Sequence, residues 1–372
     1  MFPDAFMVPT QDDGGWLWLA QFVLIDGKMR GIFTLLFGVG VYIFMERAWA
    51  KGFTSLLQVR RLFFLLLFGL LHFFFFFKGD ILVSYAISGL FVLAFIRWKP
   101  KSLFKLGISI YLIGTIVYIA MVLPLHLVAD TSLGESAAMT EFRSELEEGK
   151  KEAIAADLIE ANLKRSGDYR TLIFHRLAND SFFPLTNAIF FFFEAFPLML
   201  LGVALYKAGF FSGAFQNARL RFWAWFAFII GALFHLGIGL WVKFTDFTYY
   251  GTLAAFVGLS SFPRLLMSVG VLSLLVQKSD KWHGRVAQRF IAAGRVAFSN
   301  YIGTSAVMLV IFHGWGLGFY GELNRPQLLC ITVLAWVAML FWSKLWLNHY
   351  RYGPLEWLWR CLTYGKIFPS KR

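Results

Sequence analysis

A series of long apolar segments, recurring from residue 30 to residue 346, constrains this chain more than any other feature of its sequence. A helix that crosses a bilayer needs about 20 mostly apolar residues. Only 15% of the residues are charged, which is too few to cover a soluble protein of 372 residues. The sequence therefore predicts an all-α fold, a polytopic transmembrane helix bundle of about nine spans. These are residues 30–46, 62–77, 81–96, 104–124, 182–206, 222–242, 251–276, 297–317 and 327–346.

The predicted spans divide the chain into four regions. An outer N-terminal segment and the first four spans come first, and a polar extracytoplasmic insertion follows them. Five further spans and a cytoplasmic, interfacial tail complete the chain. In this order the regions are residues 1–124, 125–181, 182–346 and 347–372.

The Lys and Arg residues of the loops predict the orientation. Short cytoplasmic loops of membrane proteins carry an excess of Lys and Arg. Four alternate loops and the tail are basic here, whereas the short loops between them hold only Lys78, Lys243 and Arg325. The C-terminus is therefore predicted to lie in the cytoplasm.

Three polar segments flank the spans. Residues 138–165 are rich in Ala, Glu, Lys and Leu, which favours one or two helices over the outer mouth. These helices are either a lid or a solvated connector. An aromatic and basic interfacial helix is predicted to begin near Pro354, with a cytoplasmic gate as the alternative. Residues 1–27 are predicted to lie outside, and an outer N-terminus without a leading helix suggests that a further N-terminal span is missing.

The net charge of +13 does not indicate nucleic-acid binding. The basic residues are spread through short loops, without a basic domain or a recognition module. Cys330 and Cys361 lie too far apart along the chain to form a plausible disulfide, and their spacing suits no metal site. The lipid bilayer is the predicted partner, with a small-molecule or lipid substrate, and no metal is predicted.

Several ionisable residues fall inside the apolar spans. Such groups cost a few kcal/mol or more in hydrocarbon, so they usually face a cavity or a partner. His72, Asp80, His235 and His313 are predicted at similar depth in the outer half of the membrane, and Glu194 lies near the middle of its span. We therefore expect one shared polar cavity that opens outward, although each His alone has the alternative of bonding a backbone carbonyl.

Arg264 and Asn300 complete the candidate ligand-binding residues. Arg264 follows Pro263 in the middle of a span, where proline removes a backbone hydrogen bond and predicts a kinked or broken helix. An Arg beside freed backbone groups suits an anionic ligand, but an ion pair with Glu194 is equally open. Asn300 begins a span, where it lines an entrance or caps the helix.

Several motifs together resemble the YeiB-like bacterial membrane proteins, a domain-of-unknown-function family (DUF418). They are Gly27-Lys28-Met29-Arg30-Gly31, Leu35 to Gly40, Arg60-Arg61, Gly69 to His72 with Gly79 to Leu82, Gly294-Arg295 with Ser299-Asn300-Tyr301, and Arg351 to Arg360 with Thr363-Tyr364-Gly365. The resemblance covers nearly the whole chain and implies the bacterial cytoplasmic (inner) membrane. Family members usually begin with a further helix, and its motif is absent here.

The family looks distantly similar to membrane acyltransferases. This resemblance implies transfer of an acyl group from a cytoplasmic thioester, such as acyl-CoA, to an acceptor near the outer face. His72 and Asp80 are then the predicted catalytic pair, because a positioned His suits the removal of a proton from the acceptor. Two alternatives are a transporter of a small anionic metabolite, with its site at Glu194, Pro263 and Arg264, and a non-catalytic scaffold.

Overall fold

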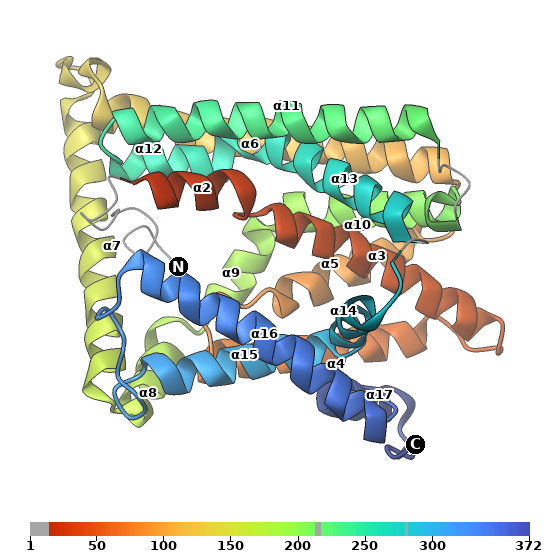
Figure 1. The fold of residues 1–372 in the computed structure, drawn as a ribbon. Coiled ribbons are helices and arrows are strands. Elements are labelled where there is room, and N and C mark those ends of the chain that lie inside the picture. The colour runs from red at the N-terminus through yellow and green to blue at the C-terminus, as the bar shows by residue number, and fades with distance from the viewer. Residues whose placement is uncertain (1–14, 213–216, 280–281) are drawn as a thin grey trace. The chain divides into compact units, whose positions relative to one another are not determined.

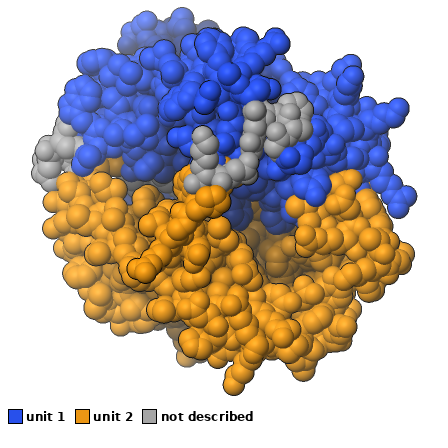
Figure 2. Space-filling model, turned by 45° about the vertical axis from the view of Figure 1, so that its right-hand side comes forward, with its two compact units in different colours: residues 1–40, 94–159, 191–278 blue, residues 41–93, 160–190, 279–372 orange. Residues whose placement is uncertain are grey.

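The computed structural model describes residues 15–212, 217–279 and 282–372, and within these ranges it is built from helices without a β-strand (Figure 1). The all-α prediction is therefore confirmed. The chain forms two compact units, each assembled from three separate stretches of sequence and coloured separately in Figure 2. Unit 1 comprises residues 1–40, 94–159 and 191–278, and unit 2 comprises residues 41–93, 160–190 and 279–372.

The helices of unit 1 pack around a buried apolar core. Leu35 of α3 and Tyr111 of α6 meet Leu198 of α10 and Leu265 of α13 in this core. The helices are α2 (Trp16–Leu24), the first half of α3 (Lys28–Trp49), α6 (Pro100–Asp130), most of α7 (Thr140–Ser166), α10 (Phe192–Lys207), α11 (Ala218–Phe244), α12 (Tyr249–Leu253), the π-helix η3 (Ala254–Leu259) and α13 (Ser261–Lys278).

Unit 2 contains the remaining helices. They are the second half of α3, α4 (Leu56–Phe75), nearly all of α5 (Leu82–Phe95), the end of α7, α8 (Tyr169–Asn179), α9 (Phe183–Phe190), α14 (Arg285–Arg295), α15 (Ala297–Phe312), α16 (Arg325–His349) and α17 (Pro354–Tyr364). Short 3₁₀ turns occupy Ser132–Glu135 and Phe210–Ser212. Helix α7 covers nearly all of the predicted helical stretch 138–165, and a helix begins at Pro354 as predicted, whereas α8 lies beyond the predicted stretch.

The described helices include five that are long and apolar enough to cross a membrane, or up to eight if each pair that is bent at a short break counts as one span. The third predicted span, residues 81–96, corresponds to α5, which has only 14 residues. At 1.5 Å per residue this helix is shorter than the bilayer core of about 30 Å. The chain thus has the length and composition of a multi-pass membrane protein.

Two helices were not anticipated from the sequence. Helix α2 buries Trp18, Leu19 and Phe22 within residues 1–27, the segment predicted to lie outside without a leading helix. Helix α14 lies in the basic loop between the predicted spans 251–276 and 297–317, and it is bent by 83° from α15. Its apolar side chains, Val286, Phe290 and Ile291, are exposed beside its arginines, which is typical of a helix at a membrane surface.

The predicted interruption near Pro263 is also present. The π-helix η3 ends at Leu259, and the chain bends by 49° before α13 begins at Ser261. Pro263 has no N–H to donate to the carbonyl four residues earlier, that of Leu259. The loss of this hydrogen bond explains why the break lies at Ser260 rather than at the proline itself.

Candidate functional site

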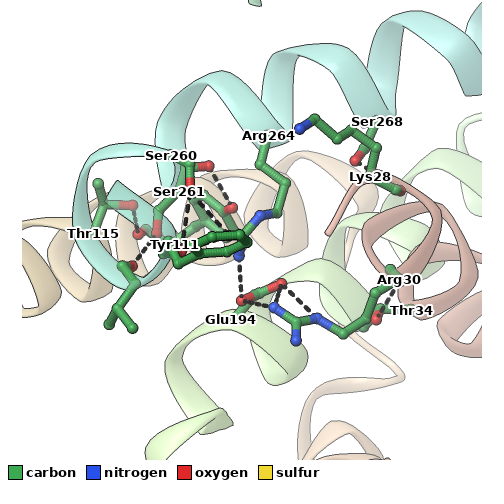
Figure 3. Close-up of polar contacts among 12 residues, drawn as sticks. Lys28, Arg30, Thr34, Tyr111, Thr115, Glu194, Ser260, Ser261, Arg264 and Ser268 are labelled. Carbon is green, nitrogen blue, oxygen red and sulfur yellow. Dashed lines mark hydrogen bonds and ion pairs between the residues drawn. The ribbon is translucent and has the colours of Figure 1, made fainter. Parts of the chain in front are cut away.

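A buried ion cluster in unit 1 is centred on Glu194 (Figure 3). Arg30 Nη2 lies 3.1 Å from Glu194 Oε1 and 3.0 Å from Oε2, and Arg30 Nε lies 3.3 Å from Oε1. From the other side, Arg264 Nη1 donates to Oε2 at 2.9 Å. Glu194 and Arg264 are almost fully buried, whereas the Arg30 side chain is 31% exposed. The Arg264–Glu194 ion pair, which the sequence left as an alternative, is therefore formed, and Arg30 joins it.

Interrupted helices place both partners of this pair. Glu194 lies in the first turn of α10, just after the break at Phe191, where a carboxylate is favoured by the helix dipole. Arg264 lies just after the break at Ser260 and donates hydrogen bonds to oxygen atoms on the preceding side of the break. Its Nη2 donates to Phe256 O at 2.8 Å and to Ser260 Oγ at 3.1 Å. The guanidinium thus donates hydrogen bonds to a carbonyl of the π-helix and to the Glu194 carboxylate at the same time.

Two further buried groups of unit 1 lie near the cluster, Lys28 at the start of α3 and His235 on α11. The Lys28 side chain is buried and donates to Phe22 O, and the Lys28 carbonyl accepts from Ser268 Oγ at 3.2 Å (Figure 3). His235 is buried against Phe22 and its Nδ1 lies 3.0 Å from Gly231 O of its own helix. His235 therefore has the backbone partner that was considered as its alternative, and its role as a ligand-binding residue stays a prediction.

A second polar network, in unit 2, connects three side chains in a row. Asp80 Oδ1 lies 2.8 Å from His72 Nδ1, and His72 Nε2 lies 2.8 Å from Ser305 Oγ on α15. His72 and Asp80 are almost fully buried, and Ser305 is half-buried. A carboxylate at one ring nitrogen fixes the tautomer of a neutral imidazole and leaves the other nitrogen as an acceptor. The row therefore has the order acid, base and hydroxyl.

The turn between α4 and α5 holds Asp80 in place. Its second oxygen accepts from Val83 N at 2.9 Å and so caps the first turn of α5. Gly69 allows α4 to approach this turn, because a Cβ there would lie 3.0 Å from Asp80 Oδ2 and 2.8 Å from Val83 N. Tyr301 lies beside the pair, with its hydroxyl accepting from Ile81 N at 3.2 Å. The tyrosine and the glycine keep the carboxylate directed at His72.

Asn300 and His313, also in unit 2, have local partners. Asn300 Oδ1 accepts from Trp342 Nε1 at 2.8 Å, and its Nδ2 donates to Ala293 O and Ser343 Oγ, each at 3.1 Å. These contacts join α15 to α14 and α16. His313 ends α15 and packs beside Tyr169 and Trp315. Their predicted binding roles have no direct support from these contacts and stay predictions.

The seven candidate residues thus belong to two units. Glu194, His235 and Arg264 lie in unit 1, and His72, Asp80, Asn300 and His313 lie in unit 2. The single outward-opening cavity stays a prediction. Arg30 and Ser305 were missed. Arg30 is the first residue of the predicted span 30–46, where a charge is typical of the membrane boundary. Ser305 is a hydroxyl residue inside a span, and such a residue has no distinguishing pattern in the sequence.

A cavity in unit 1 opens toward the apolar surface of its helices. Its volume is about 680 Å³, and its lining is entirely Leu, Ile, Phe, Trp and Gly side chains. Gly237 forms part of this lining, and a Cβ there would meet no atom within 4 Å. A lining of this kind suits an acyl chain. The lining residues are Leu123, Ile230, Leu233, Phe234, Gly237, Ile238, Trp241 and Leu259.

A third network fixes the end of the polar insertion in unit 2. Glu160 of α7 accepts from Arg176 Nη2 at 2.8 Å and forms ion pairs with Lys78 and Lys164, each at 3.2 Å. Arg176 also donates to Phe74 O at the end of α4, at 3.3 Å. Burial raises the pKa of Glu160, but the charges of Lys164 and Arg176 outweigh it and hold this pKa well below its ordinary value of 4.5.

This network predicts an acid-sensitive stability. A carboxylate whose pKa is lowered by folding stabilises the fold above its unfolded pKa, and this contribution is lost as the pH falls. The melting temperature of the wild type should therefore decrease as the pH drops below about 4.5. The Glu160→Gln variant should melt lower at pH 7 and depend less on pH, whereas Glu148→Gln, at an exposed site, should follow the wild type. Parallel pH profiles for Glu160→Gln and the wild type would contradict this role.

Comparison with known proteins identifies relatives over nearly the whole chain. Residues 205–366 match the family described as "Protein of unknown function (DUF418)". The "Uncharacterized protein YxaH" of Bacillus subtilis (strain 168) is 31% identical over 352 residues, which are 91% of this chain and 80% of the relative. The "Uncharacterized protein YeiB" of Escherichia coli (strain K12) is 28% identical over 367 residues, 95% of this chain and 86% of the relative. No solved structure matches the chain significantly. The chain therefore belongs to the DUF418 family of YeiB- and YxaH-like proteins.

Proposed function

We propose that this protein is a membrane acyltransferase in which His72 is the general base. The observation that carries the proposal is the row of Asp80, His72 and Ser305, with both imidazole nitrogens in contacts of 2.8 Å. General-base catalysis needs an imidazole whose free nitrogen lies within hydrogen-bond reach of a hydroxyl. Asp80 holds His72 in that orientation.

The donor in this proposal is an acyl thioester, such as acyl-CoA, that reaches the protein from the cytoplasm. The basic short loops and the C-terminal tail support a cytoplasmic C-terminus in the bacterial inner membrane. These loops also suit the phosphates of such a donor. The acceptor in this proposal is a lipid or small molecule with a hydroxyl or amine.

The test uses inverted membrane vesicles and radiolabelled acetyl-CoA as the thioester. Vesicles with the wild-type protein should transfer label to an extractable acceptor, and His72→Ala should lower the rate about 100-fold or more. His175→Ala provides a matched control, because His175 lies on an exposed part of α8 and bonds only Asn179 among the described residues. Unchanged transfer in His72→Ala would exclude this mechanism.

Transport of a small anion is the second candidate, and the ion cluster of unit 1 favours it. Two interrupted helices bring Glu194 and Arg264 together, an arrangement that transporters use for charged substrates. Among residues 15–212, 217–279 and 282–372, Arg264 Nε has no hydrogen-bond acceptor, and a Cβ on Gly27 would lie 2.3 Å from it. Counterflow of an anionic metabolite that is lost in Arg264→Gln, with acetyl transfer absent from the wild type, would favour transport.

A further inference from the structure

We infer that Ser305 is a nucleophile that carries the acyl group as an ester before the acceptor receives it. This inference rests on the proposed acyl transfer and adds a covalent step to it. Ser305 lies on α15 in unit 2, and its Oγ is 2.8 Å from His72 Nε2. Because Asp80 occupies the other ring nitrogen, the neutral imidazole presents Nε2 as an acceptor for the serine O–H.

The competing contact of Ser305 is weaker. Its Oγ also lies 3.3 Å from Tyr301 O, one turn earlier on the same helix. A hydroxyl has a single proton, so it can serve only one of these acceptors at a time. The 2.8 Å contact with His72 is the shorter, and Tyr301 O lies inside α15, where the helix supplies its own donors. The serine O–H is thus directed at His72 Nε2.

The surroundings of Ser305 also separate it from an ordinary buried hydroxyl. Thr304, the residue before it, has its hydroxyl 3.9 Å from the Met339 sulfur, and Thr332 and Ser343 donate to carbonyls of their own helix. Among the described serines and threonines, Ser305 is the one whose hydroxyl contacts a His that is itself paired with a carboxylate. Nucleophile, base and orienting acid in this order define an activated serine.

Acyl transfer through Ser305 needs two proton exchanges with His72. Ser305 Oγ bonds to the thioester carbonyl carbon while its proton moves to His72 Nε2, and the carbon–sulfur bond then breaks. The departing thiolate takes that proton and leaves as a thiol, so the acyl group remains as an ester on Ser305. An acceptor hydroxyl next gives its proton to His72 and attacks this ester. The proton returns to Ser305 Oγ as the carbon–oxygen bond to serine breaks.

A long-chain alkyl fluorophosphonate tests the nucleophile without knowledge of the natural donor. An activated serine displaces fluoride from phosphorus, and its proton passes to the base. In proteoliposomes the wild type and Thr304→Ala should become labelled on the peptide that contains Ser305. Ser305→Ala should give no adduct there, and His72→Ala should be labelled about 100-fold more slowly. Absence of an adduct in the wild type, or equal labelling of Ser305→Ala, would overturn the inference.

The transfer assay separates this inference from the proposed function. Acetyl transfer that needs His72 but persists in Ser305→Ala would overturn the serine ester and leave general-base transfer intact. Labelling at Ser305 without any acetyl transfer would support the activated serine and contradict the proposed function. In Ser305→Cys, the trapped acetyl group should be a thioester, which neutral hydroxylamine removes, whereas the wild-type ester resists it.

Discussion

Replacing Glu194 with alanine is expected to destabilise the protein by about 3–5 kcal/mol, because the change leaves buried positive charge without its carboxylate. Glu194 is 6% exposed and has contacts with two guanidinium groups, those of Arg30 and Arg264. Arg264 is 5% exposed. Unfolding in a graded series of denaturing detergent mixtures gives the free energy. Glu148→Ala, at an exposed site on α7, should change it by less than about 0.5 kcal/mol.

A second variant distinguishes an unpaired charge from a lost packing contact. If the unpaired guanidinium causes the loss, adding Arg264→Met to Glu194→Ala should restore part of the stability, since removal of both partners is less costly than removal of one. A purely packing role for these side chains would make the two changes add. A Glu194→Ala variant as stable as the wild type would show that the pair contributes nothing to folding.

Hydropathy was enough to predict most of the fold, because the length of an apolar helix is a local property of the sequence. Helices α4, α6, α11 and α16 lie where the apolar runs indicated them. Helix α2 was missed, since only nine residues separate Gly15 from Ile25 and the segment has acidic neighbours. The amphipathic helix α14 was missed because the arginines dominated the interpretation of its segment. Its packing and its bend from α15 are tertiary features.

The candidate site was predictable only where its members are near in sequence or chemically rare. His72 and Asp80 lie eight residues apart across one turn, so their pairing could be anticipated. Arg264 and Glu194 stood out as charges inside spans, although 70 residues separate them. Ser305 lies 233 residues from His72, and hydroxyl side chains are common in membrane helices. Such a contact depends on which helices pack together, and local patterns of hydropathy and charge do not reveal that packing.

The close approach of α3 and α10 within unit 1 gives the second large stability effect. A Cβ on Gly202 would lie 2.0 Å from Leu35 O, and one on Gly38 would lie 2.2 Å from Met199 O. Both obstacles are backbone carbonyls, so a new methyl group must push the helices apart instead of turning a side chain. Gly202→Ala and Gly38→Ala should each cost about 3 kcal/mol, at the upper end of overpacking effects.

Gly40 provides the matched control on the same helix. A Cβ at Gly40 would meet nothing within 4 Å, and alanine is a better helix former than glycine by up to about 1 kcal/mol. Gly40→Ala should therefore leave the unfolding free energy unchanged or raise it, while Gly38→Ala, two residues earlier, lowers it. The two changes share the chemistry of a glycine-to-alanine substitution in one helix, so opposite effects on the unfolding free energy must come from the local packing. Equal effects at Gly38 and Gly40 would mean that α3 and α10 do not approach each other as closely as the structure describes.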